Sequence, residues 1–253
     1  MLALTIAAVV AAALAVWAFR PSGPGPRPTF ASDFSGSRLN TKIWGTCYPW
    51  ADAQKGCSNF GNKEYEWYLP SQVRVSGGVL HLIAQRIPTV GQNAQAAPKQ
   101  YSCRSGMVTT YPGFRFKYGY VQVVAKVPGG PGLWPALWLA AADQEWPPEM
   151  DMLEHYGPPR VRTNVAFHPV GAPAALRYLD VANLNSGWHT FGLSWTSSRL
   201  VWFIDGRAVL TISHHIPHQP MYLIANLAVY QPPAGGQGCQ GTMLIRSIKV
   251  WQN

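Results

Sequence analysis

Short segments rich in β-branched and aromatic residues recur between turns from residue 71 to the end of the chain. They occupy residues 73–85, 118–127, 132–140, 191–212 and 221–229. Runs of this kind, bounded by Gly, Pro, Asn and Asp, are typical of strands. No window of twelve or more residues beyond the N-terminal segment shows convincing helical periodicity. The pattern predicts an all-β domain with two packed antiparallel sheets.

Two tight turns are expected inside the segment 191–212. One is centred on Thr196–Arg199, and the other on Asp205-Gly206-Arg207. Asp-Gly is a strong hairpin signal, because both residues tolerate the positive φ of a two-residue turn. The polar stretch 90–100 is expected, by contrast, to form a long surface loop.

The first 19 residues are apolar and are followed by Arg20. About 20 apolar residues span a bilayer, whereas the hydrophobic core of a signal peptide needs about 7–15. No Lys or Arg precedes the run and no convincing cleavage site follows it, which favours a membrane anchor over a signal peptide for residues 1–20. An anchor of this kind would be expected to hold the domain outside the cytoplasm. Arg20 and Arg27 conflict with that orientation, because they follow the apolar run and the positive-inside rule would then place the domain in the cytoplasm. A basic segment upstream would remove the conflict.

Residues 21–28 predict an extended Pro/Gly linker, and residues 29–253 are expected to form the folded domain.

The amino-acid composition excludes some classes of protein and of binding partner. Aromatic residues make up 12% of the chain, with 11 Trp and 11 Tyr, and charged residues also make up 12%. A disordered chain would be rich in charge and poor in aromatic residues, so this class is excluded. The net charge of +9 comes from basic residues scattered singly, without a basic helix or stripe, so nucleic acid is not an expected partner. Many Trp and Tyr with few charges suit stacking on neutral ligands such as sugars, although core packing accounts for most of them.

The cysteines are Cys47, Cys57, Cys103 and Cys239. None forms a C-x-x-C motif, so they predict no metal site. An even number behind an export-type segment favours disulfides, with four free thiols in a cytoplasmic protein as the alternative. Four cysteines can pair in three ways. The short loop between Cys47 and Cys57 favours a disulfide between these two, which leaves Cys103 to pair with Cys239.

Three of the 11 acidic residues, Glu149, Asp151 and Glu154, lie within six positions. On a strand Glu149 and Asp151 share a face, and a β-bulge between Asp151 and Glu154 would bring the third carboxyl onto it. Such crowding raises the pKa of at least one carboxyl. An ionised carboxylate beside a protonated one is the pair that glycoside hydrolysis requires. An edge strand with its charges in solvent is the alternative, which the interleaved Met150 and Met152 disfavour.

The sequence PPEMDMLEHYG (147–157), preceded by PGGPGLWPALWLAAADQEW (128–146), resembles the catalytic region of glycoside hydrolase family 16. It is similar to the branch with a bulged E-x-D-x-x-E pattern, which includes laminarinase-like and galactan-cleaving enzymes. The resemblance extends over residues 30–252. It implies a concanavalin-like jelly-roll sandwich of two curved antiparallel sheets, with a substrate cleft on the concave face.

The resemblance also implies roles for individual residues. Glu149 matches the nucleophile, Glu154 the general acid/base, and Asp151 the carboxylate that tunes them. The residues that match or resemble substrate-binding positions are Asn62, Glu64, Arg104, Trp134, Trp138, Trp146 and His168. No role is assigned to His155, Tyr156, His189, His214, His215 or His218.

The chain departs from the family pattern in two places. Asn226–Val229 continues into Tyr230 and prolines, where laminarinase-like sequences have glycines and a tryptophan, so β-1,3-glucan specificity is in doubt. Arg246 occupies the position of an aspartate in calcium-binding members, with Asp33 at the first-strand position. A cation would lose a ligand there and face a positive charge, so we expect no metal at that site, and no cofactor.

These observations predict a monomeric, retaining endo-β-glycanase that hydrolyses β-linked polysaccharide of β-1,3-glucan or galactan type. It is expected outside the cytoplasm, secreted or held at a membrane by its N-terminal segment. A wall-remodelling transglycosylase is one alternative. A catalytically inactive lectin is another, because fold does not fix function, although a binder has no need for three crowded carboxyls.

Overall fold

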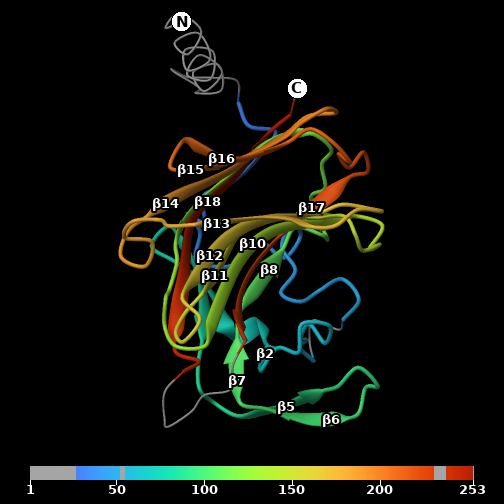
Figure 1. Cartoon of the computed structure of the whole chain (residues 1–253). Helices are drawn as coiled ribbons and strands as arrows, with labels where there is room; N and C mark the ends of the chain where they lie inside the picture. The colour runs from blue at the N-terminus through green and yellow to red at the C-terminus, as the bar shows by residue number, and fades with distance from the viewer. Residues whose placement is uncertain (1–26, 52–54, 231–237, 253) are drawn as a thin grey trace, which may run out of the picture.

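The computed structural model describes residues 27–51, 55–230 and 238–252 (Figure 1). Its long strands form two layers, and a smaller group of short strands lies beside one of them. The all-β, jelly-roll prediction is therefore confirmed. The predicted anchor or signal peptide at residues 1–20, and most of the linker at 21–28, fall outside the described residues. No helix in the described part of the chain is long and apolar enough to cross a membrane.

The larger layer is an eight-stranded antiparallel sheet. In spatial order it contains β16 (Arg207–Ile212), β15 (Leu200–Ile204), β14 (His189–Trp195), β9 (Gly119–Lys126), β18 (Gly241–Trp251), β4 (Val79–Ala84) and β3 (Val73–Ser76), while β1 (Phe30–Ser32) also pairs with β18.

The second layer is a six-stranded antiparallel sheet that curves across the molecule in Figure 1. Its order is β13 (Ala175–Leu179), β12 (Arg162–His168), β11 (Glu149–Tyr156), β10 (Leu133–Ala141), β17 (Met221–Val229) and β8 (Met107–Thr109). Two short pairs flank it: β2 (Glu66–Tyr68) with β7 (Cys103–Ser105), and β5 (Thr89–Gln92) with β6 (Pro98–Tyr101).

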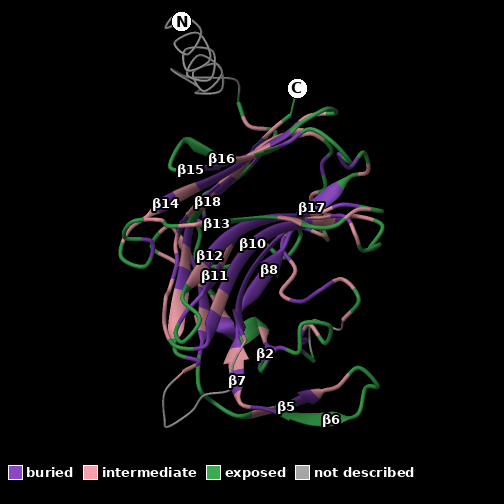
Figure 2. Cartoon of the chain, in the orientation of Figure 1, coloured by how far each residue is buried: buried purple, intermediate pink, exposed green. Residues whose placement is uncertain are grey.

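Strand β10 illustrates how the sequence gives this sheet an apolar side and an open side. Leu137 and Leu139 are fully buried in the core between the sheets. The alternate residues Trp134, Ala136 and Trp138 line a cleft on the opposite face. Because side chains alternate along a strand, one sequence serves both faces. Every residue of β17 is buried, as Figure 2 shows, since loops cover parts of its outer face as well.

The predicted hairpins at Thr196–Arg199 and Asp205-Gly206 are confirmed as the β14–β15 and β15–β16 connections. Asp205 and Gly206 adopt φ angles of 49° and 76°, as the turn requires. The prediction of a loop at 90–100 is wrong, because these residues contribute to the β5–β6 hairpin. The Asn93 side chain closes its turn by accepting hydrogen bonds from nearby backbone N–H groups. These strands are polar and largely exposed, so they lack the alternation that marks a strand in sequence.

The structure joins Cys103 to Cys239 across 136 positions. Cys47 and Cys57 are free, so the prediction of a Cys47–Cys57 disulfide is wrong. Both thiols are buried, and the Cys57 Sγ lies 3.8 Å from the Met107 Sδ. Burial, and next the neighbouring Cys47, raise the pKa of the Cys57 thiol well above its usual value, which keeps it protonated and unreactive.

Candidate active site

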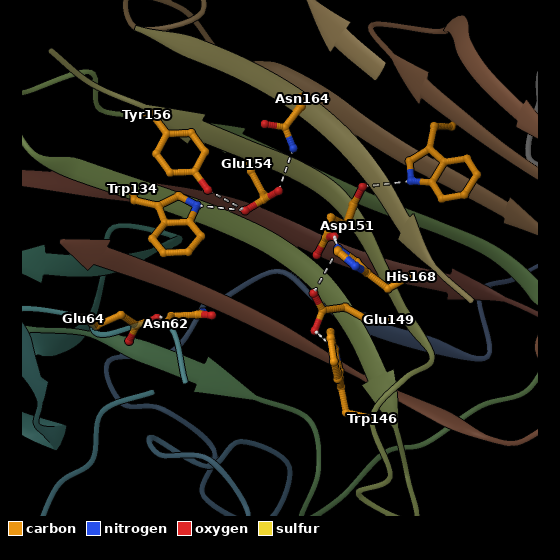
Figure 3. A network of polar contacts seen from close by, with 11 residues as sticks. Asn62, Glu64, Trp134, Trp146, Glu149, Asp151, Glu154, Tyr156, Asn164 and His168 are labelled. Atoms are coloured by element: carbon orange, nitrogen blue, oxygen red, sulfur yellow. Dashed lines mark hydrogen bonds and ion pairs between the residues drawn. The ribbon is translucent and has the colours of Figure 1, made fainter. Parts of the chain in front are cut away.

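A cleft of about 600 Å³ opens on the face of the six-stranded sheet that points away from the core. Strands β10, β11, β12 and β17 form its floor, and residues 48, 50 and 59–64 contribute to one wall. Figure 3 shows three carboxyls on β11 with side chains from the neighbouring strands around them. This is the face on which the sequence predicted the acidic cluster.

A bulge in β11 places the three carboxyls on one face. Glu149 opposes His168, Asp151 opposes Ala166, and Glu154 opposes Asn164 on β12. The register shifts between Asp151 and Glu154, so two residues of β11 face one residue of β12. Without this shift, Glu154 would point into the core. The predicted bulge is therefore confirmed.

Glu149 and Asp151 form one electrostatic unit with His168. The His168 Nε2 lies 3.3 Å from the Asp151 Oδ2 and 3.8 Å from the Glu149 Oε1. The exposed Trp146 indole donates a hydrogen bond of 3.1 Å to the Glu149 Oε2. The Asp151 side chain is 5% exposed and that of Glu149 20%. Asp151 is thus the more completely dehydrated of the two carboxyls.

Burial raises the pKa of both carboxyls well above their usual values. For Glu149 the next cause is the charge of Asp151, and for Asp151 it is the charge of Glu154. Two carboxyls this close bind one proton between them. Asp151 is the more buried, and its Oδ2 faces the His168 Nε2 at 3.3 Å. These rises are partly offset: a hydrogen bond with Glu149 lowers the pKa of Asp151, and the charge of His168 and the Trp146 hydrogen bond lower the pKa of Glu149.

Glu154 sits in a separate hydrogen-bond cradle. Its Oε1 accepts from the Trp134 Nε1 at 3.0 Å and from the Tyr156 hydroxyl at 3.1 Å, and its Oε2 accepts from the Asn164 Nδ2 at 2.6 Å. The Trp134 and Tyr156 rings stack with centroids 4.9 Å apart, so the donors hold one another in place. This cradle fixes the Glu154 carboxyl at the floor of the cleft.

Comparison with known proteins identifies this arrangement. Residues 62–243 match the family described as Glycosyl hydrolases family 16. The chain belongs to glycoside hydrolase family 16. Family membership agrees with the resemblance noted in the sequence, and the three carboxyls lie inside the matched region.

Two curated relatives of this family 16 chain come from Rhizobium meliloti (strain 1021). The endo-1,3-1,4-beta-glycanase EglC is 32% identical over 241 residues, which cover 88% of this chain and 51% of the relative. The endo-1,3-1,4-beta-glycanase ExsH is 33% identical over 216 residues, which cover 79% of this chain and 46% of the relative. The chain thus spans about half the length of these relatives.

The fold is also that of solved structures. The catalytic domain of an endo-1,3-beta-glucanase (laminarinase) from Thermotoga petrophila RKU-1 superposes with a TM-score of 0.75 at 24% identity. The match covers 90% of this chain and 98% of that domain. At this identity the likeness establishes the architecture.

The tryptophans predicted for this family 16 site all reach the cleft. Trp134 and Trp138 share a face of β10, as their spacing predicted. Trp138 is nearly buried and donates to the Asn226 Oδ1 at 2.8 Å, so it forms part of the floor. Trp146, 66% exposed, stands at the rim beside His168. Its exposed ring is available to stack on a sugar.

Asn62 and Glu64 lie in the opposite wall of the cleft (Figure 3). The Asn62 Nδ2 donates to the Glu64 Oε1 at 3.4 Å. Glu64 is buried beside Glu66, and burial raises the pKa of both carboxyls, that of Glu66 the more strongly. A second pair of buried acids therefore lies beneath this wall.

One predicted substrate residue lies elsewhere. Arg104 is on β7, where its backbone pairs with Gln85, and it is absent from the described residues that line the cleft. The structure thus does not bring Arg104 to the site. The parallel pairing of β2 with β7, which sets its position, has no signature in the sequence.

The sequence analysis missed Tyr156 and Asn164, which hold Glu154. The sequence predicts no role for Tyr156, although it follows Glu154 by two positions and alternation alone puts both side chains on one face. Asn164 could not be found this way, because its position depends on the pairing of β11 with β12. His155, also left without a role, faces the core side and bonds to Thr163 and Asn185.

In the described part of the chain, one group of side chains has a geometry compatible with a metal ion. Glu149, Asp151 and His168 place their ligand atoms within 4.8 Å of one another. These groups belong to the acidic cluster of the cleft already described. The Arg246 guanidinium, at the position where calcium-binding members have an aspartate, lies 4.1 Å from the centroid of the Trp188 ring.

Proposed function

We propose that this chain is a retaining endo-β-glucanase that hydrolyses β-1,3-linked or mixed β-1,3-1,4-linked glucans. The observation that carries the proposal is that Glu149 and Glu154 project into one cleft from a single bulged strand, with Asp151 between them. The glucan specificity rests on the activities named for the two Rhizobium relatives, and the endo mode on a cleft open to a polymer.

The proposed reaction has two steps. A Glu149 oxygen attacks the anomeric carbon and forms a glycosyl ester, while the bond to the leaving oxygen breaks and that oxygen takes the proton of Glu154. Water then attacks the same carbon, gives its proton to Glu154, and releases Glu149 as a carboxylate. Two displacements on one carbon restore the original β configuration. Glu149 must be ionised when it attacks, and the His168 Nε2, 3.8 Å from the Glu149 Oε1, favours that charge.

The test uses laminarin, barley mixed-linkage β-glucan and a β-galactan, with ¹H NMR of the first products. We expect the β-anomer to appear first on a glucan, and the Glu149→Gln variant to lose at least about a thousandfold in turnover while still binding it. An α-anomer as first product would contradict retention. Preferential cleavage of galactan would contradict the glucan assignment. Products longer than the substrate would indicate a transglycosylase. Binding of the glucan without cleavage would indicate a lectin.

We also propose that the domain works outside the cytoplasm. The Cys103–Cys239 disulfide and the apolar run at residues 1–19 support this location, because disulfides persist in oxidising compartments. Peptide mapping of protein recovered from its native compartment should find Cys103 and Cys239 joined. Four alkylatable thiols there would contradict the proposal.

A further inference from the structure

Two arginines surround the tyrosine that supports Glu154. The Arg160 guanidinium lies 5.0 Å from the Tyr156 ring centroid and 4.8 Å from that of Tyr230. The Arg162 guanidinium lies 4.9 Å from Tyr156 and 5.0 Å from Tyr178. We call Arg160 and Arg162 the arginine pair. The tyrosine rings pack against the guanidinium planes and hold them in place.

Arg162 lies at the Glu154 end of the site, whereas Arg160 stands beside it on the Tyr156 ring and is not among the described residues that line the cleft. Arg162 is directly opposite Tyr156 in the β11–β12 register and lines the same cleft as Glu154. Residues two apart on a strand are separated by about 7 Å, so Arg162 lies one such step beyond Asn164, the partner of Glu154. Glu149 and Trp146 lie at the other end (Figure 3). Because Glu154 protonates the leaving oxygen in the proposed reaction, Arg162 borders the leaving-group side of the cleft.

The positive charge at this end is not neutralised. Among the residues that the structure describes, neither arginine forms an ion pair with a carboxylate. The Arg162 Nε is buried and has no hydrogen-bond partner within the same described residues. The exposed Asp180, which follows strand β13, lines a separate groove together with Arg162. Among the described residues it makes no ion pair with Arg162. A dehydrated donor without a partner costs free energy unless a ligand supplies the acceptor.

We propose that Arg162, with the charge of Arg160 beside it, forms a subsite for an anionic group, a carboxylate or a sulfate, carried by the sugar on the leaving-group side of the scissile bond. The natural substrate is then an acidic β-glucan rather than a wholly neutral one. A guanidinium presents a planar set of donors that matches a carboxylate or sulfate. Arg162 lines the cleft and its Nε has no hydrogen-bond partner among the described residues, while the same side chain also hydrogen-bonds Tyr156. This inference rests on the proposed function, because it names the substrate class of the same site.

The test compares three substrates with one backbone: laminarin, lightly carboxymethylated laminarin and lightly sulfated laminarin. The readout is the ratio of kcat/KM on each anionic substrate to kcat/KM on laminarin. We expect Arg162→Gln to lower this ratio about tenfold or more, since charge-assisted pairs are stronger than neutral hydrogen bonds. Arg162→Lys keeps the charge without the bidentate geometry and should lower it less. Added salt should lower the ratio of the wild type more than that of Arg162→Gln.

Product analysis gives a second, independent readout. The leaving fragment begins with the sugar that occupied the arginine subsite, so wild-type products should carry substituents enriched at their non-reducing ends. Arg162→Gln should remove that enrichment. The carboxymethyl and sulfate arms show which of the two groups the subsite prefers.

The controls separate the possible failures. Arg207→Gln changes an exposed arginine on β16 of the other sheet and should leave the ratio as in the wild type. Arg160→Gln changes the exposed member of the pair and reports on the subsite if Arg162→Gln does not fold. If the wild type cleaves laminarin but the Arg162 and Arg160 variants leave the ratio unchanged, the subsite is wrong and the proposed function stands. If the wild type cleaves none of the β-glucans, the proposed function fails and the subsite with it.

Discussion

Glu154 makes three hydrogen bonds at once, two to its Oε1 and one to its Oε2. This cradle fixes the direction in which the carboxyl presents its oxygens, and Trp134 and Tyr156 pack against each other to hold it. The position of Glu154 therefore depends on its neighbours as much as on its own strand. Its proposed role as proton donor can be tested separately from the role proposed for Glu149.

We expect Glu154→Gln to reduce turnover of a glucan by about a hundredfold to ten-thousandfold, because the amide cannot protonate the leaving oxygen. The loss should be much smaller with a dinitrophenyl β-glucoside oligomer, whose leaving group needs no proton. Steady-state kinetics on the two substrates measure the difference. An equal loss on both would show that Glu154 is not the proton donor. The thermal unfolding midpoint of each variant controls for misfolding.

At the scale of the elements, the bulge of β11 decides which side chains face the substrate. Met152 and Leu153 are both buried where regular alternation would bury only one of them. Removing one residue at the bulge would leave Glu149, Asp151 and Glu154 at alternate positions, still on one face. Removing a residue between Glu149 and Asp151 would instead put these two on opposite faces.

Deleting Met152 should therefore preserve detectable glucanase activity, whereas deleting Met150 should abolish it. Each deletion removes a buried methionine, so both should cost roughly 2–5 kcal/mol of stability. Activity per folded molecule, with the folded fraction taken from chemical denaturation, is the measurement. The bulge account would be contradicted if the two deletions were equally inactive at equal stability.

The elements also show what the sequence can predict. Residues 221–229 form the strand β17 with the expected bounds, because a run buried on both faces is apolar at nearly every position, Asn226 being the exception. The β5–β6 hairpin was missed, since its exposed polar strands carry no such pattern. The Cys47–Cys57 pairing was wrong because loop length says nothing about where two side chains point. Arg162 had no signal, because only the β11–β12 register brings it to Tyr156.

Across the whole molecule, four carboxyls are buried with raised pKa values: Glu64, Glu66, Glu149 and Asp151. The folded state therefore binds protons that the unfolded chain, with ordinary carboxyl pKa values of about 4, has released. Stability from these groups is fully present below about pH 4 and is lost as the pH rises through the folded pKa values. His155, whose pKa burial lowers, acts in the opposite direction below about pH 6.5.

We expect the free energy of unfolding to fall by at least about 1 kcal/mol between mildly acidic and mildly alkaline pH. Glu66→Gln should flatten this dependence, because it removes one of two coupled acids while keeping an oxygen for the Val229 N–H. Urea titrations across the pH range measure the slope. The exposed Asp180→Asn should leave the slope unchanged. A stability that rises with pH in the wild type would refute the assignment.

The Trp202 indole on β15 reaches across the core and donates a hydrogen bond of 2.9 Å to the backbone carbonyl of Asp151. The carbonyl lies at the start of the bulge, where regular pairing with β12 is interrupted. The far sheet thus supplies a partner for the catalytic strand. A designer who grafted the β10–β11 hairpin onto another sandwich would transfer the carboxyls and lose this donor. The smallest part of the site that could be transferred to another protein therefore includes Trp202, although this tryptophan is buried in the core and does not line the cleft.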